Sequence, residues 1–313
     1  MTQTPVHPGP GRDQVTRPVV SEPPAPARRG AAPRWLAAVG LVPFAAYLLL
    51  FLLLPTVLAI GSGLVDGDGA FTLANIAALG DPVILMTFGN STWLSVLTAL
   101  IGAVVGAGVC YALLGLPETG VVRTLVDAAS GVLAQFGGVM LAFAWIATIG
   151  IQGIVTQALA AGFGIDLFAD GAWIYALPGL ILPYVYFQVP LMVITFMPAM
   201  NALKPQWAEA NLTLGGTRAG FWRTIGIPVL APSFFASLLL LFANAFSSYA
   251  TAAALASQGS QIVPLQIRTA LTSETLLGRE NLAGALALGM IVVVAIVMWG
   301  YSLVQRRAAR WQA

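Results

Sequence analysis

Residues that commonly carry out catalysis or bind metals are scarce in this sequence. The chain has one histidine, His7, and one cysteine, Cys110, so His and Cys cannot form a metal cluster and no intrachain disulfide is expected. His7 lies in a Pro- and Arg-rich stretch before the first apolar run, which leaves no histidine for a Ser-His-acid triad. No G-x-x-x-x-G-K-[ST] sequence occurs, so no P-loop ATP site is expected. We therefore expect no enzyme, no metal site and no cofactor in this chain.

Two groups of polar side chains lie inside long apolar runs of the sequence. A polar group in the hydrocarbon of a membrane is costly unless it is buried among helices or faces water. Two interpretations stay open: the groups line a solute path, or they form hydrogen bonds within and between helices. These candidate solute-path residues are Tyr184, Tyr186 and Gln188 in the first group, and Asn244, Ser247, Ser248, Tyr249 and Thr251 in the second.

A polar stretch at residues 204–228, KPQWAEANLTLGGTRAGFWRTIGIP, separates two of the apolar runs. Pro205 can begin a helix there, because its missing N–H would be unpaired at a helix start anyway. Gly215 and Gly216 suit the left-handed backbone that commonly ends a helix. At helical spacing, the residues on one face of this helix are Trp207, Ala210, Asn211 and Leu214.

A second short helix is expected after the two glycines. Thr217 can cap its start, and Phe221, Trp222 and Ile225 would form its apolar face. Pro228 is expected to break the backbone before the next apolar run. Residues 204–228 thus predict a helix-turn-helix connection between two apolar segments.

The spacing within this connection resembles the EAA signature of permease subunits of ABC importers. Glu209-Ala210 is followed by Gly215, six residues after the glutamate, and then by Ile225-Gly226-Ile227-Pro228. Asn211 departs from the signature, which has a second alanine there. In that family the helix around the signature is a coupling helix that docks in a cleft of the ATPase subunit. The resemblance implies that Glu209 and Ala210 contact the ATPase, that Gly215 makes the turn, and that Ile225 and Pro228 anchor the return to the membrane.

The composition is that of an integral membrane protein. Only 8% of the residues are charged, 58% are hydrophobic and the mean hydropathy is +0.86. A soluble domain carries about 25% charged residues. A water-soluble core of 313 residues could not hide so much apolar surface.

The sequence predicts an all-α membrane protein with six transmembrane helices, because six apolar runs reach the ~20 residues that a bilayer requires. The second run is over-long and is expected to begin with an interfacial turn at residues 87–91, while the third is interrupted by Asp127 and Gln135. Gly102 and Gly106 in the second run form a G-x-x-x-G pattern, which lets two helices approach closely. The runs are residues 36–60, 87–115, 124–150, 172–200, 229–256 and 281–304.

The distribution of basic residues predicts the orientation in the membrane. Of the 14 Lys and Arg residues, only Arg268 and Arg279 fall on the side opposite to the two termini. Because Lys and Arg collect on the cytoplasmic side, both termini and the Glu209 connection are expected in the cytoplasm. The basic residues on that side are Arg12, Arg17, Arg28, Arg29, Arg34, Arg123, Lys204, Arg218, Arg223, Arg306, Arg307 and Arg310.

Together, the signature and the six runs resemble a type I ABC importer permease with the MetI-like fold, over about residues 36–307. We expect a disordered basic cytoplasmic tail at residues 1–33 and a permease domain at residues 34–313 that contains the coupling loop 201–228. The resemblance implies a bacterial cell membrane and three kinds of partner besides the lipid bilayer. These partners are a cytoplasmic ABC ATPase dimer, a second permease subunit that is identical or homologous, and an extracytoplasmic solute-binding protein; no nucleic acid is expected.

The solute is expected from the branch that the chain resembles, which is the spermidine/putrescine type. That resemblance rests on the long N-terminal tail, the length of the chain and Pro264-Leu265 before the last run. Sugar, glycerol phosphate, phosphonate, thiamine and iron stay open as alternatives, and a membrane scaffold protein is the alternative of a different class.

Overall fold

The computed structural model describes residues 34–117, 119–256, 262–272 and 280–309 of the chain. The expected tail at residues 1–33 lies outside them. The chain divides into two compact units, Met1–Leu54 and Pro55–Ala313. Within the described residues all regular structure is helical, apart from one isolated bridge between Val65 and Phe71. The predicted all-α class is therefore confirmed.

The first unit consists, in its described part, of helix α1 (Arg34–Leu48) and a π-helical turn at Leu49–Leu53. Pro43 lies inside α1. The side chains described here are apolar and exposed; Phe51, for example, is 70% exposed. Such a helix, apolar all round, is typical of a membrane span surrounded by lipid.

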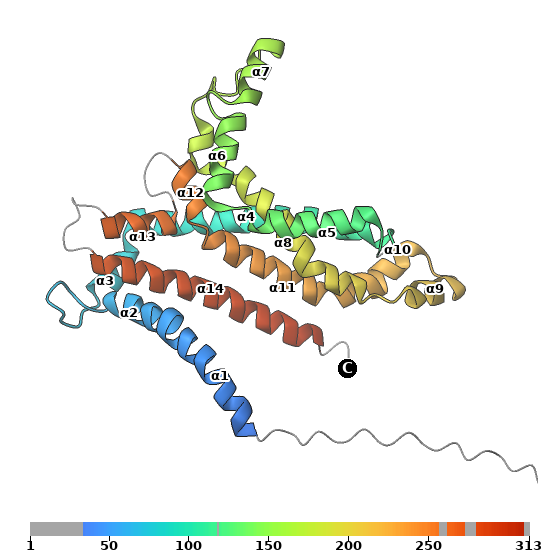
Figure 1. Ribbon diagram of the computed structural model, residues 1–313, viewed down its shortest axis with the longest axis horizontal. Coiled ribbons are helices and arrows are strands. Elements are labelled where there is room, and N and C mark those ends of the chain that lie inside the picture. Colours follow the sequence, from blue (N-terminus) through green and yellow to red (C-terminus); the bar gives the residue numbers. More distant parts are fainter. Residues whose placement is uncertain (1–33, 118, 257–261, 273–279, 310–313) are drawn as a thin grey trace, which may run out of the picture. The chain divides into compact units, whose positions relative to one another are not determined.

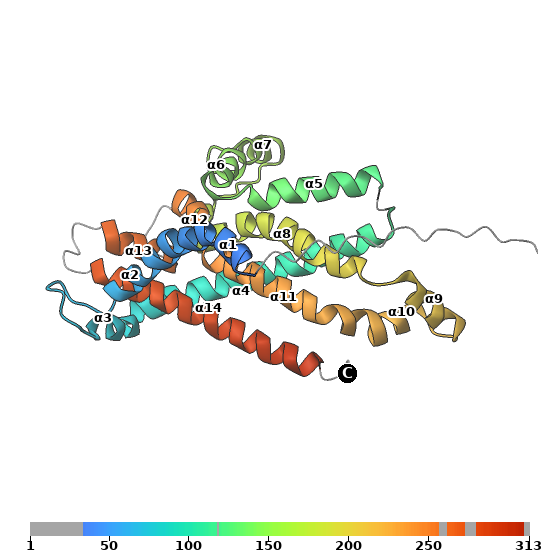
Figure 2. The ribbon, with the colours of Figure 1, turned by 60° about the horizontal axis from the view of Figure 1, so that its bottom comes forward.

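The second unit contains the remaining helices, which Figures 1 and 2 show from two directions. Helix α8 packs against α4, α5 and α11, and α14 packs against α11 and α13. The α-helices are α2 (Leu54–Ser62), α3 (Ala74–Ala77), α4 (Pro82–Leu114), α5 (Val121–Gln135), α6 (Gly138–Ile149), α7 (Ile154–Phe163), α8 (Ile181–Asn201), α9 (Pro205–Thr213), α10 (Arg218–Phe221), α11 (Ile227–Phe246), α12 (Ala250–Leu255), α13 (Val263–Thr272) and α14 (Glu280–Ala309). Short 3-10 turns occur at Ala78–Gly80, Trp173–Tyr175 and Leu177–Leu180.

Six helical segments in the described residues are long and apolar enough to cross a membrane. The protein is thus a multi-pass membrane protein, as the composition predicted. Their bounds differ from the predicted runs at several ends, for reasons given below. The segments are Leu41–Ser62, Pro82–Leu114, Gly138–Phe163, Leu177–Asn201, Arg218–Phe246 and Asn281–Leu303.

Helix α4 begins earlier than the sequence predicted. Asp81 caps it by accepting a hydrogen bond from the Val83 N–H at 2.8 Å, and Pro82 lies in its first turn. The expected interfacial turn at residues 87–91 is therefore wrong. Thr87 stays in the helix because its hydroxyl donates to the Val83 carbonyl of the same helix at 2.8 Å, so the polar side chain needs no break.

The small residues of α4 allow it to approach α8 closely, as the G-x-x-x-G pattern predicted. A Cβ atom added to Gly102 would lie 2.5 Å from Gln188 Cβ, and one added to Gly106 would lie 2.5 Å from Met192 Cβ. Real Cβ atoms do not come so close, so only glycine fits at both positions. The two helices form the centre of the unit, where Ala103 and Met192 are fully buried.

The third predicted run, residues 124–150, is not one straight helix. Helix α5 ends at Gln135, and Gly138 starts α6 with φ +74°, a left-handed backbone that glycine adopts without strain. Figure 1 shows α6 and α7 leaving the α4–α8–α11 group at a steep angle. The two adjacent glycines at 137 and 138 permit this change of direction, which hydropathy alone does not detect.

The fifth predicted run, residues 229–256, is also divided. Helix α11 ends at Phe246, and α12 begins only at Ala250. At the other end the predicted break at Pro228 is wrong, because the helix continues from α10 through a π-helical turn at Trp222–Gly226 into α11. Pro228 lies just after that π-helical turn, in the first turn of α11, and it does not end the helix.

Candidate functional site: coupling helix and solute path

Helix α9 has the local structure that its sequence predicted. Pro205 lies in its first turn, and Gly215 follows its end with φ +81°. The Gly216 N–H donates to the Asn211 carbonyl at 2.8 Å, which closes the helix end in the manner of a Schellman turn. The predicted left-handed turn at Gly215 is thus present.

Asn211, the residue that departs from the EAA signature, holds the turn together. Its side-chain amide donates to the Thr217 carbonyl at 3.0 Å, across the two glycines. Thr217 in turn caps α10, because its hydroxyl oxygen accepts from the Gly220 N–H at 3.0 Å. A Cβ atom on Gly216 would collide with the Asn211 amide group, so a larger residue there would displace that amide from its contact with Thr217.

Aromatic packing joins this connection to the membrane helices. The Trp222 ring meets Tyr111 of α4 edge to face, with centroids 5.3 Å apart. A Cβ atom on Gly226 would lie 2.5 Å from the Trp222 ring, so the indole covers the π-helical turn. The α9–α10 connection is therefore packed onto the end of α4 and continuous with α11.

The side of α9 that carries Trp207 and Leu214 does not pack against its own chain. Trp207 is 38% exposed and Leu214 is 88% exposed, whereas Ala208 and Asn211 are the more covered residues. The covered side of α9 is the one toward the end of α4, where Ala208 and Asn211 line a cavity with Tyr111. Two large apolar side chains of this polar connection, Trp207 and Leu214, are therefore exposed.

The five residues assigned to ATPase coupling occupy different surroundings. Glu209 is exposed and lines a cavity of about 560 Å³ with Arg218 and the end of α4. Ala210 is exposed, and Gly215 makes the turn described above. Ile225 is half-buried in the π-helical turn and Pro228 is exposed.

Three of the candidate solute-path residues form hydrogen bonds between segments instead. The buried Tyr184 hydroxyl donates to the Ser248 carbonyl at 2.8 Å, and the Gln188 amide donates to the Leu241 carbonyl at 3.0 Å. The Thr251 hydroxyl accepts from the Gly138 N–H at 2.9 Å, where α6 begins. These contacts favour the structural interpretation for Tyr184, Gln188 and Thr251.

Three others line a polar cavity of about 270 Å³. Asn244, Ser247 and Ser248 meet Gln135 of α5 there, along with Phe187 and the Gly137–Gly138 break. Gln135 was not among the predicted site residues. Its signal was available in the sequence, because a polar residue followed by Phe-Gly-Gly in an apolar run indicates a helix end.

The two remaining tyrosines lie elsewhere. Tyr186 is half-buried and packs against the apolar cluster around Tyr184. Tyr249 is 41% exposed and lines a separate cavity of about 420 Å³ that also includes Arg268. Neither is grouped with Asn244 and Gln135.

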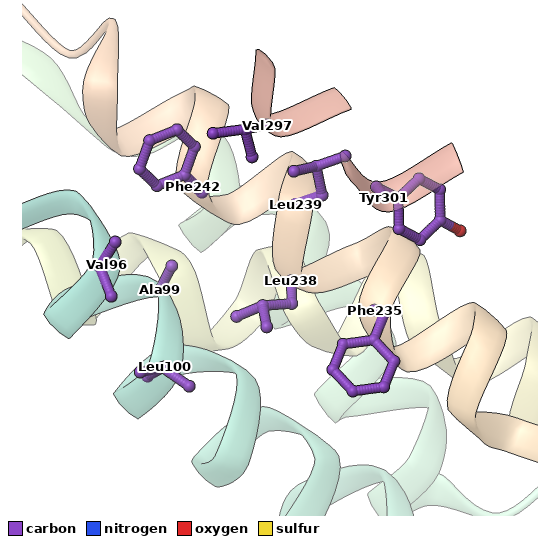
Figure 3. Close-up of a pocket in the computed structure, with 9 residues that line it drawn as sticks. All are labelled: Val96, Ala99, Leu100, Phe235, Leu238, Leu239, Phe242, Val297 and Tyr301. Atoms are coloured by element: carbon purple, nitrogen blue, oxygen red, sulfur yellow. The ribbon is translucent and has the colours of Figure 1, made fainter. Parts of the chain in front are cut away.

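A groove between α4, α11 and α14 is lined by apolar side chains, unlike the polar cavity at Asn244. Figure 3 shows its walls, where aliphatic and phenyl side chains face the opening and the Tyr301 hydroxyl is the one side-chain oxygen drawn. This groove of about 370 Å³ offers a polar solute almost nothing to bind. Of these two spaces between membrane helices, the polar cavity at Asn244 is the one suited to a polar solute.

Comparison with known proteins shows which proteins the chain is similar to. No protein-family model matches the chain. The trehalose transport system permease protein SugB of Mycobacterium tuberculosis is 26% identical over 219 residues, covering 70% of this chain and 71% of that protein. The probable ABC transporter permease protein y4fN of Sinorhizobium fredii is 26% identical over 277 residues, covering 85% of this chain and 45% of that protein.

Further matches agree with these two. The ferric transport system permease protein FbpB of Actinobacillus pleuropneumoniae is 24% identical over 200 residues, which are 64% of this chain and 28% of that protein. The chain thus spans less than half the length of two of these three relatives. A chain of the bacterial alginate ABC transporter, solved with its alginate pentasaccharide-bound periplasmic protein, superposes with a TM-score of 0.71 at 16% identity, over 87% of this chain and 94% of that chain.

The chain has the fold of an ABC importer permease. In this permease fold, the polar connection that contains α9 links the fourth and fifth membrane segments, Leu177–Asn201 and Arg218–Phe246. The relatives carry the names of transport subunits. The similarity to ABC transporter permeases that residues 204–228 indicated is confirmed at this level.

Proposed function

We propose that this chain is the permease subunit of an ABC importer. It forms a solute pathway across the membrane and couples that pathway to a separate cytoplasmic ATPase. The observation that carries the proposal is α9, which combines exposed Trp207 and Leu214 with attachment at both ends to membrane helices. Large apolar side chains on a polar connection are typical of a surface that a partner protein covers.

The contacts within the α9–α10 connection suit it to transmit a movement. Asn211 ties the turn, Trp222 at the start of the π-helical turn packs on α4, and that turn continues into α11. A displacement of α9 would therefore be passed on to α11 rather than be absorbed in a loose loop. Domain movement of two ATPase subunits is thus transmitted to the membrane helices, which open to either side in turn.

The proposed orientation places both termini and α9 in the cytoplasm of a bacterium, with the chain in the cell membrane. The basic-residue bias supports it. Arg123 and Asn201 meet at the same end of the unit as the start of the α9 connection, with Arg123 Nη2 donating to Asn201 Oδ1 at 2.7 Å. Lys204, Arg218 and Arg223 follow within that connection.

The proposed partners are an ABC ATPase dimer, a second permease chain of the same or a related kind, and an extracytoplasmic solute-binding protein. One chain carries one α9, so two permease chains are needed to engage two ATPases. The solute-bound periplasmic protein in the alginate transporter supports the third partner. The relatives above carry the names of trehalose and ferric transport systems, and none is named for a polyamine, so they give the spermidine/putrescine branch no support.

Uptake measurements test the proposed function. Purified with its partner subunits and placed in proteoliposomes, the protein should take up solute only when ATP is supplied to the ATPase. Glu209→Ala should reduce this uptake if the acid contacts the ATPase, while the chain still reaches the membrane. A solvated charge there would contribute only ~0.3–1 kcal/mol and its loss would go unnoticed.

Gly215→Val separates the turn from the charge. A Cβ at Gly215 meets nothing within 4 Å, so the substitution is strained only through the φ of +81°. A β-branched residue does not readily adopt that backbone, so α9 should be displaced and uptake lost more completely than with Glu209→Ala. If no ATPase copurifies with the wild-type chain in any detergent or in lipid, the scaffold alternative is favoured. If both variants keep normal uptake at normal membrane levels, the coupling assignment is wrong.

A further inference from the structure

The polar cavity at Asn244 lies where two broken membrane helices end. Helix α5 ends at Gln135 and α11 ends at Phe246, and residues from both ends line the cavity. The N–H groups that would extend these helices are used elsewhere. The Gly138 N–H donates to Thr251, and the Ser248 N–H donates to the Ala245 carbonyl at 3.1 Å rather than to Asn244.

Two helix ends of this kind bring backbone acceptors to the cavity. The last carbonyls of a helix lack intrahelical donors and carry a partial negative charge, roughly half an electron charge per helix. Helix α6 begins at Gly138, which also lines the cavity, so its N-terminal N–H groups offset part of that charge. The cavity therefore combines donors with acceptors, and hydroxyl or ammonium hydrogens would find acceptors there.

The side chains that line the cavity distinguish between a solute with hydroxyl groups and one with ammonium groups. None of the described residues that line the cavity carries a charge. Arg123, on the same helix as Gln135, is three turns away and already bonded to Asn201. The acid on that helix, Asp127, is about two turns from Gln135 and does not line the cavity. A cation would have to leave water without a carboxylate in the lining to pair with, which is costly in a membrane protein.

Gln135, Asn244 and Ser247 instead offer a mixture of acceptors and donors. Each amide has two N–H donors and one carbonyl acceptor. The Ser247 hydroxyl already donates to the Ala243 carbonyl at 2.8 Å, so it is left as an acceptor. A group of adjacent hydroxyls, each of which both donates and accepts, matches such a lining.

We propose that this cavity is a solute subsite that takes an uncharged, polyhydroxylated solute such as a sugar or a sugar alcohol. The inference rests on the proposed function and names its substrate class. The volume of about 270 Å³ lies just below the usual range of ligand pockets, about 300–1,000 Å³, and suits a single sugar ring rather than a longer chain.

The test uses the complete transporter, purified with its partner subunits and reconstituted in proteoliposomes. The uncharged probes are labelled trehalose, glucose and mannitol; sulfate is the anionic probe and spermidine the cationic one. We expect ATP-dependent uptake of at least one uncharged probe and none of sulfate or spermidine. Uptake of sulfate or spermidine, or failure of all uncharged probes in a complex that still contains its ATPase, would overturn the inference. Absence of any associated ATPase would instead contradict the proposed function.

Two variants then test the cavity itself. Gln135→Ala and Asn244→Ala should each reduce uptake of the transported probe about 2- to 10-fold, the effect of one lost hydrogen bond. Gln157→Ala in α7 is the matched control, because that amide is exposed and outside the cavity. Equal uptake by all three variants would show that the solute does not bind here.

Discussion

Thr251 shows how a single side chain permits a helix break inside the membrane. Its buried hydroxyl accepts from the Gly138 N–H, which would otherwise have no partner at the start of α6. An unpaired backbone donor in a buried site costs about 1–3 kcal/mol. The break that forms one wall of the polar cavity therefore depends on a contact between residues 113 positions apart.

Thr251→Val keeps the shape of this side chain and removes the acceptor. We expect a loss of about 1–3 kcal/mol in stability, seen as a lower Tm of the purified protein in detergent. Thr195→Val is the matched control, because the Thr195 hydroxyl donates only to carbonyls of its own helix, Leu191 and Met192. A Thr251→Val variant as stable as Thr195→Val would show that the Gly138 contact contributes nothing.

At the scale of elements, the close contact of α4 with α8 depends on glycines that face the partner helix. Gly106→Ala would bring a methyl group to 2.5 Å from Met192 Cβ and 2.9 Å from the Val189 carbonyl. Overpacking of this kind costs about 1–3 kcal/mol. Gly108, two residues along the same helix, has open space around it.

The pair Gly106→Ala and Gly108→Ala therefore separates packing from helix propensity. Gly108→Ala should raise Tm slightly, since alanine is favoured over glycine in a helix by about 1 kcal/mol. Gly106→Ala should lower Tm despite the same gain in propensity. A rise in Tm for both variants would mean that the helices are not held at the distance described.

At this scale, the local structure of turns and caps could be predicted from the sequence, but the contacts made by distant parts of the chain could not. The turn at Gly215, the cap at Thr217 and the glycine contact of α4 follow from short-range backbone and side-chain rules. The breaks after Gln135 and Phe246 were missed because both neighbouring segments are apolar, so hydropathy continues across them. What permits the first of them, Thr251, comes from a distant part of the chain. For α9, periodicity shows which residues share a face, and not which face has a neighbour in the chain.

At the scale of the whole molecule, the proposed orientation places α9 and the loop at Asp68 on opposite sides of the membrane. In a chain without Cys110, Asp68→Cys should react with a membrane-impermeant thiol reagent added to intact cells, because that loop residue is exposed. Thr217→Cys should react only after the membrane is permeabilised. Labelling of Thr217→Cys from outside would reverse the orientation and remove the coupling role of α9.

The most direct test of the central claim is a crosslink from α9 to the ATPase. Leu214 is 88% exposed and ends the helix that is proposed to dock. In the Cys110-free chain, Leu214→Cys carrying a short photoactivatable thiol reagent should crosslink to the copurified ATPase subunit, and the yield should change when ATP is added. Asp166→Cys, on the opposite side, is the control and should give no such product. A crosslink from neither position, or equal crosslinking from both, would contradict the assignment of α9 as the coupling helix.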